Sequence, residues 1–224
     1  MSADPPGAVA LALQGERLAL LPDRAAWWPR RSTLLVADVH VGKSATFRTL
    51  GVPVPGATDA GTLARLDALL RATGAARLVV LGDLLHARAA HAPAILARLA
   101  AWRGAHRDVE MVLVRGNHDA RAGDPPAALG IAVVDEPLSD GPFALCHEPR
   151  ARPGGYVLAG HLHPAVRLSA RGDALRLPCF WFGAQVGVLP AFGEFTGSLT
   201  VRPAAGDRVF ALAGERVIGL PARG

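Results

Sequence analysis

Short apolar runs alternate with polar, glycine-rich turns along the first half of this 224-residue chain. Short runs rich in β-branched residues are typical of buried strands, whereas leucines three or four residues apart are typical of amphipathic helices. The pattern predicts strands at 33–37, 77–81 and 109–114 and helices at 58–73 and 92–104. Because these strands and helices alternate, the strands should pair in parallel through right-handed crossovers.

The flanking regions follow other patterns. Residues 9–21 hold two apolar runs on either side of a glycine, which predicts a hairpin at the edge of a sheet. Residues 22–31 are interpreted as a loop in which Trp27 and Trp28 anchor packing, and residues 41–50 as a short helix. Beyond the last helix the pattern predicts only short strands, at 142–146, 155–159, 174–182, 198–202 and 208–212.

Side chains able to bind metal follow five of the predicted strands directly. In a layered α/β fold such strand ends meet at one crevice, so these side chains should converge there. Carboxylates, imidazoles and one amide oxygen, without thiolates, suit Mn²⁺, Fe or Zn²⁺ better than a structural zinc-finger site. With one carboxylate shared, the set would form a two-metal site with ions roughly 3.5–4 Å apart. The residues are Asp38, His40, Asp83, Asn117, His147, His161 and His163.

The stretch from Arg115 to Asp119 is the polar turn with the most varied chemistry. Gly116 lets the backbone turn sharply after the preceding strand. Asn117 offers a neutral oxygen, His118 titrates near neutral pH, and Asp119 is a carboxylate able to orient that imidazole. A turn of this kind indicates a site only when other strands end in the same way.

The same side chains form, in order, the motifs DxH, GD, GNH(D/E), H and GHxH between residues 34 and 163. These motifs resemble the signature of the calcineurin-like metallophosphoesterases, and their combination is specific although each piece alone is weak. The resemblance implies an α/β fold of two mixed β-sheets packed face to face and flanked by helices (an αββα sandwich), as a single domain over 1–224. It also implies that one ion binds Asp38, His40 and His163 and the other Asn117, His147 and His161, with Asp83 bridging the two.

Further stretches narrow the resemblance, at 37–43, 82–86, 147–149, 177–182 and 188–193. They are similar to the ligase-associated DNA damage response endonucleases, and the similarity covers nearly the whole chain. It implies an Mn²⁺-dependent phosphodiesterase that nicks DNA and is encoded beside a helicase, an exonuclease and a DNA ligase. Cys146 departs from the pattern, because related phosphoesterases often place glycine before the histidine.

This ligand set suggests how a phosphodiester would be hydrolysed. Two cations would hold the phosphate oxygens and lower the pKa of a bridging water, giving hydroxide at neutral pH. His118 is expected to stay off the metals and either to protonate the leaving oxygen or to stabilise the transition state, with Asp119, or Asp38 acting through the metal ligands, as its partner. His86 is expected either to touch substrate phosphate or to serve only its loop. Nearby arginines could contact phosphate, pair with acids or be solvated: Arg115, Arg121, Arg150 and Arg152.

The composition adds little to this picture. A net charge of +5 fits a polyanionic partner such as DNA, but Lys43 is the only lysine and the arginines accompany a general bias to Ala, Gly and Pro. Cys146 and Cys179 are expected to be reduced core residues, which with the absence of a signal-like start predicts a cytoplasmic protein. Prolines and glycines interrupt the uncharged stretch 177–193, which argues against a membrane span.

Two alternatives stay open at this point. The same metals beside another pocket would make a phosphoesterase of a small nucleotide, and loss of the chemistry would leave a non-catalytic scaffold of the same fold. The complete ligand set and His118 speak against the scaffold, whereas only the family resemblance favours DNA over a nucleotide. The aromatic residues 180–182 could stack on bases, but their position in a strand favours the core.

Overall fold

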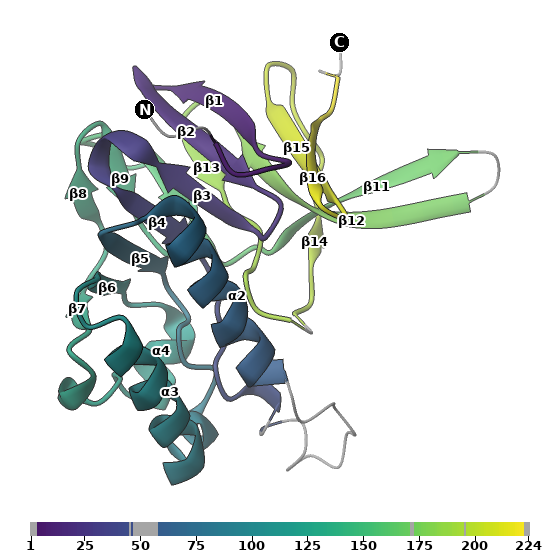
Figure 1. The fold of residues 1–224 in the computed structure, drawn as a ribbon. Helices are drawn as coiled ribbons and strands as arrows, with labels where there is room; N and C mark the ends of the chain where they lie inside the picture. Colours follow the sequence, from purple (N-terminus) through teal and green to yellow (C-terminus); the bar gives the residue numbers. More distant parts are fainter. Residues whose placement is uncertain (1–3, 45, 47–57, 171–172, 195, 222–224) are drawn as a thin grey trace.

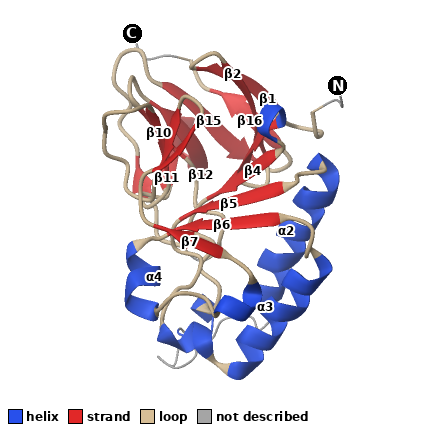
Figure 2. Ribbon diagram, turned by 90° about the vertical axis from the view of Figure 1, so that its left-hand side faces the viewer, coloured by secondary structure: helices blue, strands red, loops and turns tan. Residues whose placement is uncertain are grey.

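The computed structural model describes residues 4–44, 46, 58–170, 173–194 and 196–221, which form two β-sheets packed face to face (Figure 1). Helices cover the outer face of one of the sheets (Figure 2). The predicted fold class, two mixed sheets flanked by helices, is confirmed. In the described part of the chain, no helix is both long and apolar enough to cross a bilayer.

The first sheet has seven strands in sequence order. They are β1 (Val9–Leu13), β2 (Glu16–Leu21), β3 (Ala25–Trp28), β4 (Thr33–Val36), β5 (Arg77–Leu81), β6 (Glu110–Val114) and β7 (Ala132–Val134). Pairing is antiparallel from β1 to β4 and parallel from β4 to β7. Two helices, α2 (Thr58–Thr73) and α3 (Pro93–Ala105), supply the crossovers, as predicted. The carboxyl ends of β4, β5 and β6 therefore lie along one edge.

Alternate residues of the central strands point to opposite faces of this sheet. In β4, Leu34 and Val36 share a core with Leu66 of α2, whereas Leu35 shares a second core with Leu158 of the other sheet. Burying one such leucine stabilises the fold by about 1.5–3 kcal/mol. Packing on both faces thus fixes the strand that leads into the predicted metal ligands.

The second sheet has nine strands. They are β8 (Leu138–Asp140), β9 (Phe143–Leu145), β10 (Tyr156–Ala159), β11 (Pro164–Ala170), β12 (Asp173–Phe182), β13 (Val186–Val188), β14 (Leu199–Thr200), β15 (Arg208–Ala213) and β16 (Arg216–Gly219). Strands β9, β10 and β13 are parallel, while β12 pairs antiparallel with β11, β13 and β15. The ends of β11 and β12 project from the body as a two-stranded arm (Figure 1).

The stretch after β13 returns to the first sheet. Ala191 forms a parallel bridge with Ala37. The Phe192 N–H donates to the Ala37 carbonyl at 2.7 Å, and the Gly193 N–H donates to the Asp38 carbonyl at 2.9 Å. These bonds join the two sheets beside the turn that follows β4.

One prediction in the amino-terminal region is wrong. Residues 22–31 are not a loop throughout, because Ala25–Trp28 forms β3 between β2 and β4. Trp28 does anchor packing, since it is fully buried and its Nε1 donates to Glu16 Oε2 at 2.9 Å. The short strands β7, β8, β13 and β16 also go unpredicted, because three or four residues are too few to show a periodicity.

Other predictions fare better. Phe180 and Phe182 are buried in the core between the sheets, as expected. Cys146 and Cys179 are buried free thiols, and burial raises their pKa to about 11 and about 12. The helix predicted over 41–50 lies partly outside the described residues. Within that range, residues 43, 44 and 46 are described and helical.

Candidate metal centre

Loops at the strand ends hold the predicted ligands, and five of these ligands have a left-handed backbone. Their φ angles are 53° at Asp38, His40 and Asp83, 70° at His161 and 49° at His163. Such conformations are uncommon for residues other than glycine and cost on the order of 1–3 kcal/mol each. Backbone hydrogen bonds offset this cost, because the Asp38 N–H donates to Gly82 O at 3.1 Å and the His40 N–H donates to Asp83 O at 2.9 Å. The loops after β4 and β5 therefore hold each other in a conformation that aims side chains into the crevice.

His147 is the centre of one group of ligands. Its Nδ1 donates to the Leu81 carbonyl at 3.1 Å, which leaves a lone pair on Nε2. That Nε2 lies 2.9 Å from Asn117 Oδ1, 3.0 Å from His161 Nδ1 and 3.5 Å from Asp83 Oδ2. Four candidate ligands from four loops thus converge on one point.

Asp38 is the centre of a second group. The carboxylate is fully buried, and its Oδ2 accepts the His161 N–H at 2.9 Å. Its Oδ1 has no hydrogen-bond partner among the described residues and lies 3.4 Å from His163 Nε2. Ligand atoms of Asp38, His40 and His163 all lie within 4.8 Å of one another. A buried carboxylate oxygen without a partner is costly, and a bound cation would supply the missing interaction.

The pKa of His163 reflects its position beside Asp38. Burial disfavours the charged form of His163, but the Asp38 carboxylate, 3.4 Å away, outweighs burial and raises the pKa of His163. Its Nδ1 donates to Gly197 O at 2.9 Å, so a proton and a metal ion would compete for the lone pair on Nε2.

Asp83 lies between the two groups. Its ligand oxygen lies within 4.8 Å of the ligand atoms of Asp38 and His147, and its Oδ1 accepts the His118 N–H at 2.8 Å. Burial raises the pKa of Asp83. This position fits the predicted shared carboxylate, so all seven predicted ligands lie together at one edge of the first sheet.

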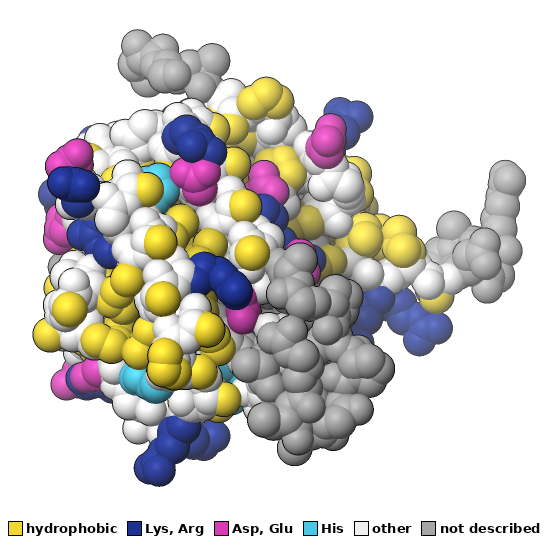
Figure 3. Space-filling model, turned by 60° about the horizontal axis from the view of Figure 1, so that its bottom comes forward, with side chains coloured by type: hydrophobic (Ala, Val, Ile, Leu, Met, Phe, Trp, Pro, Cys, Tyr) yellow, Lys and Arg dark blue, Asp and Glu magenta, His cyan; other side chains and the backbone are white. Residues whose placement is uncertain are grey.

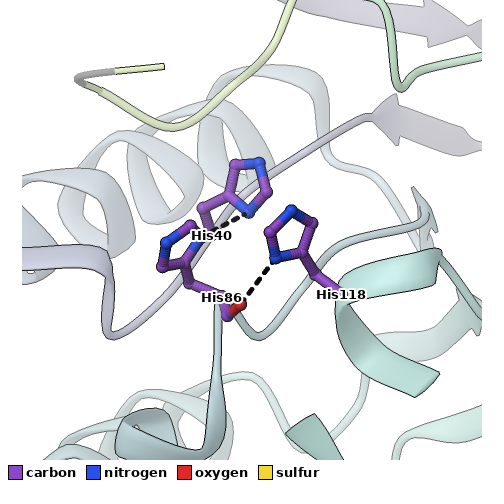
Figure 4. Close-up of side chains that lie close together, drawn as sticks. All are labelled: His40, His86 and His118. Carbon is purple, nitrogen blue, oxygen red and sulfur yellow. Dashed lines mark hydrogen bonds between the residues drawn. The ribbon is translucent and has the colours of Figure 1, made fainter. Parts of the chain in front are cut away.

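His118 is the second residue of the short helix α4 (Asn117–Ala122), and its side chain lies beside those of His40 and His86 (Figure 4). Its Nδ1 donates to the His86 carbonyl at 2.7 Å, and its ring stacks on His86 with centroids 4.9 Å apart. The His40 ring meets His118 edge-on at 5.1 Å. Because a carbonyl can only accept, Nδ1 carries a proton and Nε2 is left for chemistry.

Asp119 is not the partner of His118, so that expectation is wrong, while the alternative in which Asp38 acts through the metal ligands stays a prediction. Asp119 is fully buried, and its two oxygens accept the Leu85 N–H at 2.9 Å and the Gly116 N–H at 3.0 Å. It clamps the loops after β5 and β6 together, and burial raises its pKa to about 6. The true partner of His118 is a backbone carbonyl, for which the sequence has no signal.

Glycines at the strand ends are needed for close approach. Gly116 has φ −93° and ψ 175°, a conformation open to any residue, so the expectation that it turns the backbone sharply is wrong. A Cβ at Gly116 would instead lie 2.2 Å from Asp83 Oδ1. At Gly82 a Cβ would lie 2.0 Å from His147 Nδ1. The missing side chains make room for the ligands.

His86 and Lys43 are neighbours of the centre. Nδ1 of His86 lies 3.3 Å from Nδ1 of His40, and one of the two must donate. Burial, then the charge of Lys43, lowers the pKa of His86 to about 4, so its ring is neutral at neutral pH. Ligand atoms of His40, His86 and His118 also lie within 4.8 Å of one another, which places His86 in contact with the centre rather than only in its loop.

Most of the arginines proposed to contact phosphate are already paired with acids. Arg115 forms ion pairs with Asp124 and Asp135, Arg150 with Glu148, and Arg152 with Glu136. Within the described residues only Arg121 of the four lacks an ion pair.

Glu136 is a supporting residue that sequence reasoning missed. Its Oε2 accepts the backbone N–H of His147 at 2.8 Å and that of Glu148 at 2.9 Å. It therefore holds the loop that presents His147. Glu136 stands eleven residues before that histidine, outside any motif.

Comparisons with known proteins bear on this arrangement. A family model described as calcineurin-like phosphoesterase matches residues 32–147. The crystal structure of Pseudomonas putida nuclease MPE has 50% sequence identity and a TM-score of 0.84, and the match covers 95% of this chain and 100% of that chain. The structure of Yfce, a phosphoesterase from E. coli, has 16% identity and a TM-score of 0.42 and covers 85% of this chain and 99% of that one. No curated protein matches the sequence.

Proposed function

The chain belongs to the calcineurin-like phosphoesterase family, and from that premise we propose that it is a metal-dependent DNA endonuclease that hydrolyses phosphodiester bonds. The observation that carries the proposal is the convergence of the seven predicted ligands around an unpartnered, buried Asp38 Oδ1. The 50% identity with a nuclease over 95% of the chain supports nucleic acid as the substrate.

Two divalent ions fit this donor set. One would be held by Asp38, His40 and His163, the other by Asn117, His147 and His161, with Asp83 shared. Oxygen and imidazole donors favour Mn²⁺, with Fe or Zn²⁺ as alternatives. When bound, the ions supply Lewis-acid chemistry, which activates water and offsets charge on the phosphate.

His118 is the proposed acid. In-line attack of a hydroxide ion on phosphorus breaks the bond to the leaving oxygen, and that oxygen takes the proton from His118 Nε2. The bond from Nδ1 to the His86 carbonyl holds the ring in place. That bond is made in either protonation state, so the proton on Nε2 can leave and return without moving the ring.

The biological role follows from the substrate. We place the enzyme in DNA repair, in functional association with a helicase, an exonuclease and a DNA ligase. We also place it in the cytoplasm, where free thiols such as those of Cys146 and Cys179 persist.

The test is a manganese-dependent cleavage assay on circular duplex DNA, single-stranded DNA and a panel of nucleotides. We expect DNA to be cut and nucleotides to turn over slowly. Rapid turnover of one nucleotide with inert DNA would replace this proposal with a small-nucleotide phosphoesterase. Absence of any metal-dependent hydrolysis would favour the non-catalytic scaffold.

A further inference from the structure

A cavity of about 360 Å³ opens beside His163, between the arm and residues that include Ala191, Glu194 and Ser198. This volume lies within the roughly 300–1,000 Å³ range of ligand sites. Arg24 and Arg176 line it together with one acid, Glu194. The cavity shares His163 with the metal centre, so a ligand placed there would continue directly from the reacting phosphate.

The charges that line this cavity do not cancel. Glu194 lies 3.6 Å from Arg65, so its charge already has a partner. Arg24 donates to the carbonyls of Ala191 at 3.3 Å and Gly193 at 3.2 Å, and the charges of Glu194 and Asp23 also act on it, whereas no described acid forms an ion pair with Arg176. Arg176 donates to the carbonyl of Ser198. The cavity is therefore electropositive and suited to an anion.

The arm carries a second arginine directly opposite Arg176. In the antiparallel ladder of β11 and β12, Arg167 pairs with Arg176, and both are exposed. Neither forms an ion pair with any residue that the structure describes. Like charges directly opposite each other destabilise a strand pair. An anionic partner would offset the repulsion between the two arginines by binding to both.

The two faces of the arm differ in character. Ala165, Arg176 and Pro178 line the cavity, and the ladder places Arg167 on their face. The opposite face carries exposed leucines, Leu168 and Leu175. Along the projecting arm, Figure 3 shows dark blue basic side chains gathered on one side and yellow apolar ones on the other. The basic face is thus continuous with the cavity and with His163.

The spacing suits a nucleic-acid backbone. Arg167 lies four positions beyond His163 along the chain, which in extended strand corresponds to about 13 Å. A duplex rises about 3.4 Å per nucleotide of one strand, so the basic face spans about four nucleotides.

We propose that the cavity beside His163 binds the phosphate next to the scissile one through Arg176, and that Arg167 holds the same DNA strand further along the arm. The inference rests on the proposed function and adds the path of the bound DNA strand across the protein. It assigns substrate binding to residues outside the metal motifs.

The test compares Arg167→Gln, Arg176→Gln and the double variant with wild type. Arg98→Gln is the matched control, because Arg98 is an exposed arginine of α3 that lines neither cavity nor arm. Three quantities are measured: KM for single-stranded DNA, the salt dependence of oligonucleotide binding, and turnover of bis(p-nitrophenyl) phosphate, which needs only the metal centre. Binding is measured by fluorescence polarisation with metal chelated, so that it does not depend on cleavage.

We expect each arm variant to weaken DNA binding about tenfold, as for loss of one charged hydrogen bond. The slope of log K against log salt should fall by about 0.7 per arginine removed. Turnover of the small ester should stay at its wild-type value and the melting temperature should not fall, whereas all properties of Arg98→Gln should match those of wild type. Unchanged oligonucleotide binding in the double variant would overturn the inference whether or not the protein cuts DNA. Inert DNA with intact small-ester turnover would instead count against the proposed function.

Discussion

The metal centre and the β11–β12 arm satisfy charge in opposite ways. In the centre, Asp38, Asp83 and Asp119 are buried and receive backbone N–H groups from other loops. On the arm, Arg167 and Arg176 face each other in solvent. In the centre, hydrogen bonds and left-handed backbone conformations fix the geometry of the side chains, as the positioning of reacting groups requires. The arm keeps its charges available, as an electrostatic contact to a long polymer requires.

This difference predicts where a small change in side-chain volume or charge should affect activity or stability. A buried, tightly packed site tolerates almost no added volume, because the neighbouring atoms cannot move away. A solvent-exposed pair tolerates substitution and can even gain stability. The following predictions probe this contrast, from the largest expected effect to the smallest.

Gly116→Ala should abolish metal-dependent hydrolysis. The backbone conformation suits alanine, so the expected cause is the 2.2 Å approach of the new Cβ to Asp83 Oδ1. Metal content measured after purification should fall together with turnover. Gly61→Ala is the control, because Gly61 is exposed in α2 with nothing within 4 Å, and there alanine should stabilise the helix by roughly 0.5–1 kcal/mol. Wild-type turnover in Gly116→Ala would show that the crevice is looser than described.

His118→Ala should lower turnover on DNA by about 10²–10⁴-fold, the usual contribution of a general acid. The seven proposed ligands are untouched, so metal content should stay the same. His91→Ala removes another histidine, whose Nε2 lies 3.2 Å from the Gly123 carbonyl, and should leave turnover unchanged. Full activity of His118→Ala with metal retained would remove His118 from the mechanism.

Asp119→Asn should cost about 1–3 kcal/mol of stability, because the amide can accept only one of the two buried N–H groups that the carboxylate now accepts. Chemical denaturation would measure the loss. Asp108→Asn, at an exposed position, should change the unfolding free energy by less than about 0.5 kcal/mol. Equal stability of the two variants would argue against the clamp.

Arg167→Thr should raise the unfolding free energy by about 0.2–1 kcal/mol, since it removes a like-charge pair and places a strand-favouring residue on the arm. Thermal unfolding at low salt should show the gain most clearly, and added salt should reduce it. A loss of stability would mean that Arg167 supports the fold.

The contrast also explains what could be predicted from the sequence. The seven candidate ligands follow apolar strands directly, and parallel strands must end at one edge, so their convergence can be foreseen. The Arg167–Arg176 pair depends on a register set between two strands, which no local pattern records. The clamp by Asp119 and the carbonyl partner of His118 likewise arise only when separate loops meet.

Short strands were not predicted, for a related reason. Ala25–Trp28 has four residues and gains its strand character from neighbours on both sides, including the contact of Trp28 with Glu16. Tertiary pairing decides such segments more than their own propensity.

The bonds that join the sheets have a consequence for biosynthesis. Asp38 depends on the N–H of His161, 123 residues later, and its own carbonyl accepts the N–H of Gly193. A nascent chain therefore cannot complete this carboxylate's surroundings until most of the polypeptide has left the ribosome. The proposed DNA-cutting activity would therefore be absent from every truncated product that ends before the second sheet.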